Sequence, residues 1–299
     1  MGLRNTVELV ILAAIWGGSF LFMRVAAPEL GPVALAGLRL GIAALAIVPL
    51  LAVTRGFGDL RGRVRPLLVV GALNSAIPFC LLTYATLSVT AGFASILNAT
   101  TPLWGGLVAH LWLRDRLDRS RALGLVVGFS GVALLVWGRA SFKPGGAGLA
   151  VVAALLATLS YGVAASYTKR RLTGVNSLAV AAGSQLAAAL LLLPGTVAFW
   201  PAHPVSVRAW TAVALLAVVC TAFAYVLYFR LIAHVGPARA ISVTFLIPPF
   251  AVLWGAMFLG EALTGRMVLG SAVIFAGTAL ATGLLRLPGR RAAAIAPPT

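Results

Sequence analysis

Apolar runs of roughly 18–24 residues recur along the whole of this 299-residue chain, and each is long enough to cross a hydrocarbon core about 30 Å thick as a helix. The gaps between the runs are mostly too short for a soluble domain. Only 10% of the residues are charged, against about 25% in an ordinary soluble domain. Because a helix satisfies its own backbone groups in lipid, the sequence predicts an all-α, multi-pass membrane protein.

Proline, glycine and arginine mark the ends of the runs, as at Gly31-Pro32 and Arg65-Pro66. The first run continues to Met23-Arg24 without a small-residue cleavage site, so we expect a retained helix and not a signal peptide. The pattern predicts ten transmembrane helices over 6–26, 32–53, 66–88, 91–113, 121–138, 147–168, 176–198, 208–231, 239–259 and 265–285.

Basic residues predict the orientation, because Lys and Arg collect on the cytoplasmic side of a membrane. With the N-terminus inside, the inner segments hold Arg4, Arg55, Arg61, Arg63, Arg65, Arg114, Arg116, Arg119, Arg121, Lys169, Arg170, Arg171, Arg230, Arg239, Arg286, Arg290 and Arg291. The outer segments hold Arg139, Lys143, Arg208 and Arg266. Both termini are therefore expected in the cytoplasm. This bias also accounts for the net charge of +17 without nucleic acid as a partner.

The chain repeats itself. A shift of 146 residues places Pro102 on Pro248 and Asp115 on Glu261, and a shift of 145 places Arg24 on Lys169. We predict two five-helix repeats, residues 1–138 and 139–286, followed by a short cytoplasmic tail, 287–299. Because five is odd, the repeats have opposite orientations, as in secondary transporters whose substrate site lies between the halves.

Three stretches carry a family resemblance: IWGGSFLFMR (15–24), ATTPLWGGL (99–107) and FLIPPFAVLWG followed by FLGEALT (245–264). They resemble the EamA family of the drug/metabolite transporter superfamily, once per half. The first half has Arg114-Asp115 where the family usually shows Gly-Glu. The resemblance implies a ten-helix carrier that exports amino acids, related metabolites or drugs across the bacterial cytoplasmic (inner) membrane.

If a pseudo-twofold axis passes through the site, equivalent polar or aromatic positions of the two halves line it together. This predicts a substrate site formed by Trp16 with Tyr161, Asn74 (opposite Cys220), Phe79 with Tyr225, and Asn98 with Thr244. Packing is the alternative for two of these pairs: Asn98 and Thr244 would then form hydrogen bonds between helices, and Trp16 and Tyr161 would fill space in the bundle. Pro102 frees the carbonyl group one turn earlier, at Asn98, for water or substrate.

Arg39 also belongs to the predicted site. It lies about seven residues, or roughly 10 Å, into the second span. A central arginine costs about 2.5–3.5 kcal/mol on insertion scales and therefore needs a partner or water. It is suited to hold a substrate carboxylate with two hydrogen bonds. The alternative is that it extends outward or binds the carbonyl groups of a helix end.

Two other transport functions stay open. A multidrug efflux carrier that exchanges protons for cations needs a central carboxylate, yet all six acids lie in loops or near span ends. A sugar-phosphate-type exchanger is expected to use paired central cations, of which only Arg39 is present.

The sequence does not favour an enzyme. The histidines, His110, His203 and His234, are scattered, and no carboxylate pair or metal-binding motif occurs. We therefore expect no cofactor and no metal. The expected partners are a small-molecule substrate and the lipid bilayer, with a monomer preferred over a homodimer. Glycines of the fifth and tenth spans, such as Gly124 and Gly277, predict close helix contacts.

Overall fold

A computed structural model describes residues 2–53, 58, 60–115, 117–138, 141–142, 146–236, 240 and 243–285. Every regular element in these ranges is helical, as predicted. Six helices among them are long and apolar enough to cross a membrane, and two more are apolar but shorter. The count of ten spans and the cytoplasmic termini stay predictions. The predicted tail and eight of the orientation residues lie outside the described ranges: Arg55, Arg116, Arg139, Lys143, Arg239, Arg286, Arg290 and Arg291.

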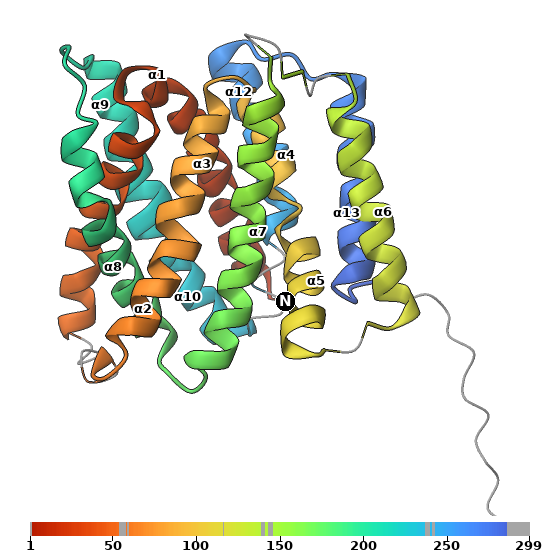
Figure 1. The fold of residues 1–299 in the computed structure, drawn as a ribbon, viewed down its shortest axis with the longest axis horizontal. Helices are drawn as coiled ribbons and strands as arrows, with labels where there is room; N and C mark the ends of the chain where they lie inside the picture. Colours follow the sequence, from red (N-terminus) through yellow and green to blue (C-terminus); the bar gives the residue numbers. More distant parts are fainter. Residues whose placement is uncertain are drawn as a thin grey trace, which may run out of the picture.

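The helices lie roughly side by side in one bundle (Figure 1). In chain order they are α1 (Leu3–Val53), α2 (Val64–Gly71), the π-helix η2 (Ala72–Ala76), α3 (Ile77–Thr86), α4 (Ala91–Asn98), α5 (Thr101–Leu113), α6 (Arg119–Val136), α7 (Gly148–Arg171), α8 (Ser177–Ala198), α9 (Val207–Ala214), the π-helix η3 (Leu215–Phe223), α10 (Ala224–Val235), α12 (Val243–Leu259) and α13 (Gly265–Ala281). The predicted span from 239 begins among residues outside the described ranges, and its described part is α12.

The element α1 consists of two helical legs. Gly31 separates them with φ 71° and ψ 166°, a left-handed φ that favours glycine. Pro32 then starts the second leg, where its missing N–H group costs no helical hydrogen bond. The two legs correspond to the first two predicted spans.

Local distortions recur at a spacing of 146 residues. The π-helix η2 (Ala72–Ala76) has its equivalent inside η3 (Leu215–Phe223). Arg114 has φ 58° and Gly260 has φ 65°, and each ends its helix in the left-handed region. The next N–H group then donates back over the last turn, from Asp115 to the Ala109 carbonyl (3.2 Å) and from Glu261 to the Gly255 carbonyl (3.1 Å). Both helices thus end in the same capping arrangement.

Two helix crossings recur in the same way. A Cβ atom on Gly17 of α1 would lie 2.8 Å from the Cβ atom of Phe250 in α12. A Cβ atom on Gly162 of α7 would lie 2.9 Å from the backbone nitrogen of Gly105 in α5. Residues 104–105 and 250–251 are 146 positions apart. The first helix of each half therefore crosses a helix of the other half, and a glycine at an equivalent position allows each crossing.

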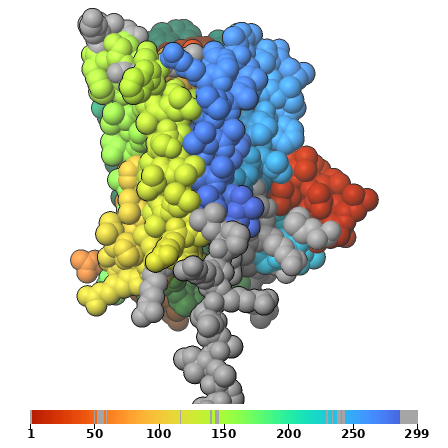
Figure 2. All heavy atoms as spheres, turned by 90° about the vertical axis from the view of Figure 1, so that its right-hand side faces the viewer, coloured from red at the N-terminus to blue at the C-terminus, as the bar shows by residue number. Residues whose placement is uncertain are grey.

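Glycines also join α6 to α13. A Cβ atom on Gly131 would lie 2.8 Å from the Ile274 backbone nitrogen, and one on Gly277 would overlap the backbone of Gly128. Figure 2 shows α6 in yellow-green and α13 in blue packed along their length. These glycines, as predicted, let two helices approach within the chain. We call this contact the α6–α13 seam.

Candidate functional site

A cavity of about 410 Å³ lies among helices from both halves of the chain. It brings together all eight residues of the predicted site: Trp16, Arg39, Asn74, Phe79, Asn98, Tyr161, Tyr225 and Thr244. Eight further residues complete the lining: Ser19, Phe20, Met23, Leu82, Thr101, Ala165, Tyr228 and Ile247. The volume falls within the range of about 300–1,000 Å³ that is common for small-molecule sites.

Arg39 is the only charged side chain among the described residues that line this cavity. It extends from the second leg of α1 and is 6% exposed. Its Nε atom donates to the Thr221 hydroxyl oxygen at 2.8 Å, and its Cζ atom lies 3.8 Å from the centroid of the Phe79 ring. An Nη1 N–H group also donates weakly to the Met23 sulfur at 4.0 Å. The remaining N–H groups of the guanidinium fork are left for another acceptor.

None of the described acids forms an ion pair with Arg39. Each of them has a partner elsewhere: Glu8 pairs with Arg4 and Arg230, Glu29 accepts from Ser206, Asp115 pairs with Lys169, Asp118 with Arg121, and Glu261 with Arg24. The sixth acid, Asp59, lies outside the described residues. A buried guanidinium without a carboxylate partner is suited to bind an anionic group.

Asn98 supplies an acceptor to the same cavity. It ends α4 where the helix breaks before Pro102. The Asn98 carbonyl group, which this break frees, accepts a hydrogen bond from the Thr101 hydroxyl at 2.8 Å. The sequence predicted water or substrate at this carbonyl, but the Thr101 side chain occupies it. The side-chain oxygen Oδ1 is buried and has no hydrogen-bond partner among the residues that the structure describes. A buried acceptor in this state favours a ligand that donates a hydrogen.

Aromatic rings form another part of the wall. The Trp16 ring centroid lies 5.2 Å from that of Tyr228 and 6.4 Å from that of Tyr225. Tyr228 was missing from the predicted site although it follows Tyr225 by three residues and so shares its helix face. Its repeat equivalent, Leu82, also lines the cavity but is aliphatic. Because the prediction used positions that are aromatic or polar in both halves, it included neither Tyr228 nor Leu82.

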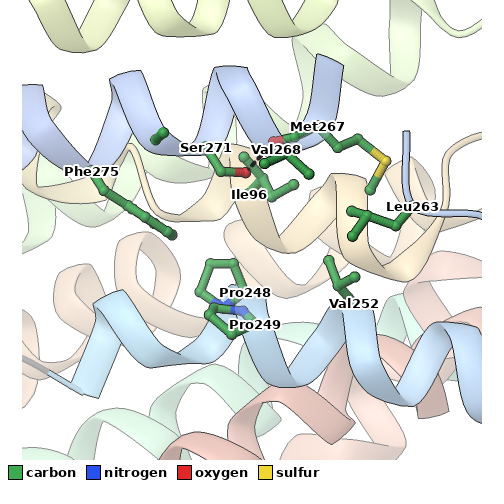
Figure 3. Close-up of a pocket in the computed structure, with 10 residues that line it drawn as sticks. Ile96, Pro248, Pro249, Val252, Leu263, Met267, Val268, Ser271 and Phe275 are labelled. Atoms are coloured by element: carbon green, nitrogen blue, oxygen red, sulfur yellow. Dashed lines mark hydrogen bonds between the residues drawn. The ribbon is translucent and has the colours of Figure 1, made fainter. Parts of the chain in front are cut away.

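A second hollow of about 390 Å³ lies between α4, α12 and α13 (Figure 3). Its lining is apolar apart from Ser271, whose hydroxyl donates to the Met267 carbonyl. Because no charged side chain is among its described lining residues, this groove offers fewer specific polar contacts than the cavity that contains Arg39. No group of three or more His, Cys, Asp or Glu residues in the described part of the chain is placed to hold a metal ion.

Equivalent ion pairs join the halves near both ends of the bundle. Arg24 of α1 lies 3.8 Å from Glu261, which precedes α13. Lys169 of α7 lies 3.0 Å from Asp115, which precedes α6. The segments between α12 and α13 and between α5 and α6 lie at opposite ends in Figure 1.

The EamA-like transporter family matches residues 6–137 and, a second time, residues 148–283. The chain belongs to this family. As an EamA-like protein with several apolar helices, it is a multi-pass membrane protein of the transporter kind.

Relatives of this EamA-like protein bear transporter names. The chain is 28% identical over 293 residues to a probable terminal-alkyne amino-acid exporter of Streptantibioticus cattleyicolor, covering 97% of this chain and 96% of that protein. It is also 28% identical over 282 residues to the uncharacterized inner membrane transporter YedA of Escherichia coli, covering 92% and 89%. A solved crystal structure shares the fold with TM-score 0.65 at 21% identity, covering 94% of this chain and 97% of that one.

Proposed function

We propose that this protein is a secondary transporter for amino acids or closely related zwitterionic metabolites. The observation that carries the proposal is Arg39, a buried cation at the cavity wall that forms no ion pair with any described acid. Leaving a charge buried and unpaired costs several kcal/mol, on the order of 3–5 when one partner of a buried pair is removed. A substrate carboxylate offsets that cost when it binds.

The remaining lining supports a zwitterion over a simple anion. An ammonium group donates hydrogens and favours aromatic faces. Asn98 Oδ1 supplies the acceptor, and the rings of Trp16 and Tyr225 supply the faces. Phe20 and Ile247 leave an apolar surface for the side chain of the substrate.

Movement of the substrate is proposed to occur by alternating access. The equivalent glycine crossings, π-helices and ion pairs support two inverted repeats, 1–138 and 139–286, that rock around the cavity. The working unit is a single chain in a bacterial cytoplasmic membrane, with both termini inside. The direction is outward, as the name of the related amino-acid exporter suggests.

The cavity gives little support to the other transport functions. No Asp or Glu is among its described lining residues, so it lacks the carboxylate that would attract a cationic drug. A phosphate dianion is better held by two cations than by Arg39 alone.

The first test is mass spectrometry of the medium of cells that produce the protein, compared with cells that carry an empty vector. We expect one or more amino acids to accumulate outside only with the native chain. Accumulation of a phosphate ester or of a compound without a carboxylate would refute the substrate class.

Arg39→Ala, produced at equal levels and checked by size-exclusion chromatography, is expected to lose this accumulation by at least tenfold. Arg266→Ala is the matched control, because Arg266 is exposed, lies away from the cavity lining and donates to the Trp137 carbonyl. Export that persists in Arg39→Ala would make this arginine structural and remove the main support of the proposal.

A further inference from the structure

Three buried polar side-chain atoms of the helices α8 and η2 have no hydrogen-bond partner among the described residues. Gln185 of α8 is 1% exposed, and neither its Oε1 nor its Nε2 atom has a hydrogen-bond partner in the described part of the chain. Ser75 of η2 is fully buried, and its hydroxyl also has no partner. The helices α8 and η2 contact each other. Burial of an amide and a hydroxyl without partners is unfavourable, so the fold keeps these groups at a cost.

The repeat relates these two residues to the charged site. The segment GLRL at 37–40 aligns with GSQL at 183–186, so Gln185 occupies in the second half the place of Arg39 in the first. The same shift of 146 places Ser75 on Thr221. Arg39 donates to the Thr221 hydroxyl at 2.8 Å, whereas their equivalents Gln185 and Ser75 remain without partners.

The residues next to Gln185 on α8 pack in the same clusters as two aromatic residues of the cavity lining. Ala182 and Ala188 lie three residues before and after it, on the same face of α8. Ala182 belongs to the cluster against which Tyr225 packs, and Ala188 to the cluster that contains Phe79. Gln185 therefore lies on α8 between two alanines, and each of them belongs to the same cluster as a ring that lines the cavity, Tyr225 or Phe79.

Arg39 and Gln185 lie at similar depths from opposite ends of the bundle. Arg39 is seven residues from the start of its leg, about 10 Å, and Gln185 is eight residues from the start of α8, about 12 Å. The second leg of α1 starts at the top of Figure 1 and α8 starts near the bottom.

We infer that Gln185 and Ser75 form a second, neutral subsite for the transported amino acid, exposed when the cavity opens toward the other end. This inference rests on the proposed function and adds a residue pair to it. Arg39 holds the carboxylate by charge-assisted hydrogen bonds, which are about twice as strong as neutral ones. The amide and hydroxyl at the second subsite hold the same groups more weakly. The substrate therefore passes between a strong and a weak subsite, which favours its departure from the weak one.

The transport test uses proteoliposomes and radiolabelled alanine, valine, leucine and phenylalanine. We expect Gln185→Leu to lower the flux at least tenfold without lowering the melting temperature, because an apolar side chain suits the dry site. Gln185→Asn, which keeps the amide, is expected to restore part of the flux. Thr278→Val is the matched control, since Thr278 is another buried hydroxyl without a partner but lies in α13, away from the cavity lining. Flux within twofold of the native level in Gln185→Leu would overturn the inference.

A second measurement does not depend on the substrate. In a background with Cys80→Ala and Cys220→Ala, a membrane-impermeant maleimide is applied to Gln185→Cys and to Thr278→Cys. We expect labelling at position 185 to be at least ten times faster, because the alternate conformation exposes it to water. Equal rates would overturn the inference. If the native chain carries none of the four amino acids but position 185 is labelled fast, the substrate class fails and the second subsite stands for another solute.

Discussion

Glu261 offers a sharp test of how the two halves are joined. Its Oε1 atom accepts from the Ala91 N–H group at 3.0 Å and its Oε2 atom from the Gly92 N–H group at 3.5 Å, at the start of α4. The carboxylate also lies 3.8 Å from the Arg24 guanidinium, and its side chain is 11% exposed. Its repeat equivalent Asp115 has a side chain that is 44% exposed and that forms an ion pair with Lys169.

The magnitudes follow from these environments. Glu261→Ala leaves the first amides of α4 without an acceptor, and a hydrogen bond to a charged group contributes about 1.5–3 kcal/mol. The partly buried ion pair adds up to about 1 kcal/mol, for a total of about 2–4 kcal/mol. Asp115→Ala removes an exposed pair that contributes about 0.2–1 kcal/mol.

The assay is thermal unfolding of both purified variants in the same detergent. At about 2–4 °C per kcal/mol, we expect Glu261→Ala to lower the melting temperature by about 4–16 °C and Asp115→Ala by at most about 4 °C. Glu261→Gln is expected to fall between the native protein and Glu261→Ala, because the amide keeps one acceptor. Equal losses in the two alanine variants would refute the role assigned to the α4 amides.

Three further changes test other parts of the structure. Gly277→Ala places a methyl group against the α6 backbone and is expected to destabilise by about 1–3 kcal/mol, whereas Gly41→Ala, where a Cβ atom meets nothing within 4 Å, is expected to be neutral or stabilising. Arg114→Gly is expected to stabilise by about 1 kcal/mol, because it relieves a left-handed φ. Asn98→Ala and Trp16→Ala are expected to abolish amino-acid flux while membrane insertion stays intact.

Melting temperatures check the first two of these changes, and flux at equal expression checks the third. Equal stability of the two glycine variants would contradict the tight α6–α13 seam. A lower melting temperature for Arg114→Gly would show that its side chain contributes more than the left-handed backbone costs. Unchanged flux in both Asn98→Ala and Trp16→Ala would show that the cavity is not the transport site.

The sequence predicted much of the helix order and the residues around the cavity, because both follow from patterns that are plain in the sequence: long apolar runs and an internal repeat. Long apolar runs define helices in lipid almost independently of tertiary contacts. The repeat then placed Asn98 and Thr244, together with Phe79 and Tyr225, at one cavity. Helix ends shifted by a few residues, as in the predicted span 208–231, where the described helix continues to Val235.

Other features depend on contacts that a pattern does not contain. Glu261 binds the start of α4, 170 residues away in the chain, a contact that no sequence pattern indicates. The break between Asn98 and Thr101 divides one predicted span, 91–113, into two helices, because the local hydroxyl groups satisfy carbonyls that the proline frees. The sequence did not predict that buried Gln185 lacks a hydrogen-bond partner, because this depends on every side chain around it in the folded bundle.

The α6–α13 seam has a consequence for how such a chain can diverge. At Gly124 and Gly277 even one added carbon atom meets backbone, so the seam leaves no room for any other residue. Around the cavity, by contrast, replacements such as Leu82 for the tyrosine of the other half alter the wall without disturbing a helix crossing. Substitutions that change the cargo can therefore accumulate at the cavity while the seam stays invariant, so that one bundle can give rise to carriers of many different compounds.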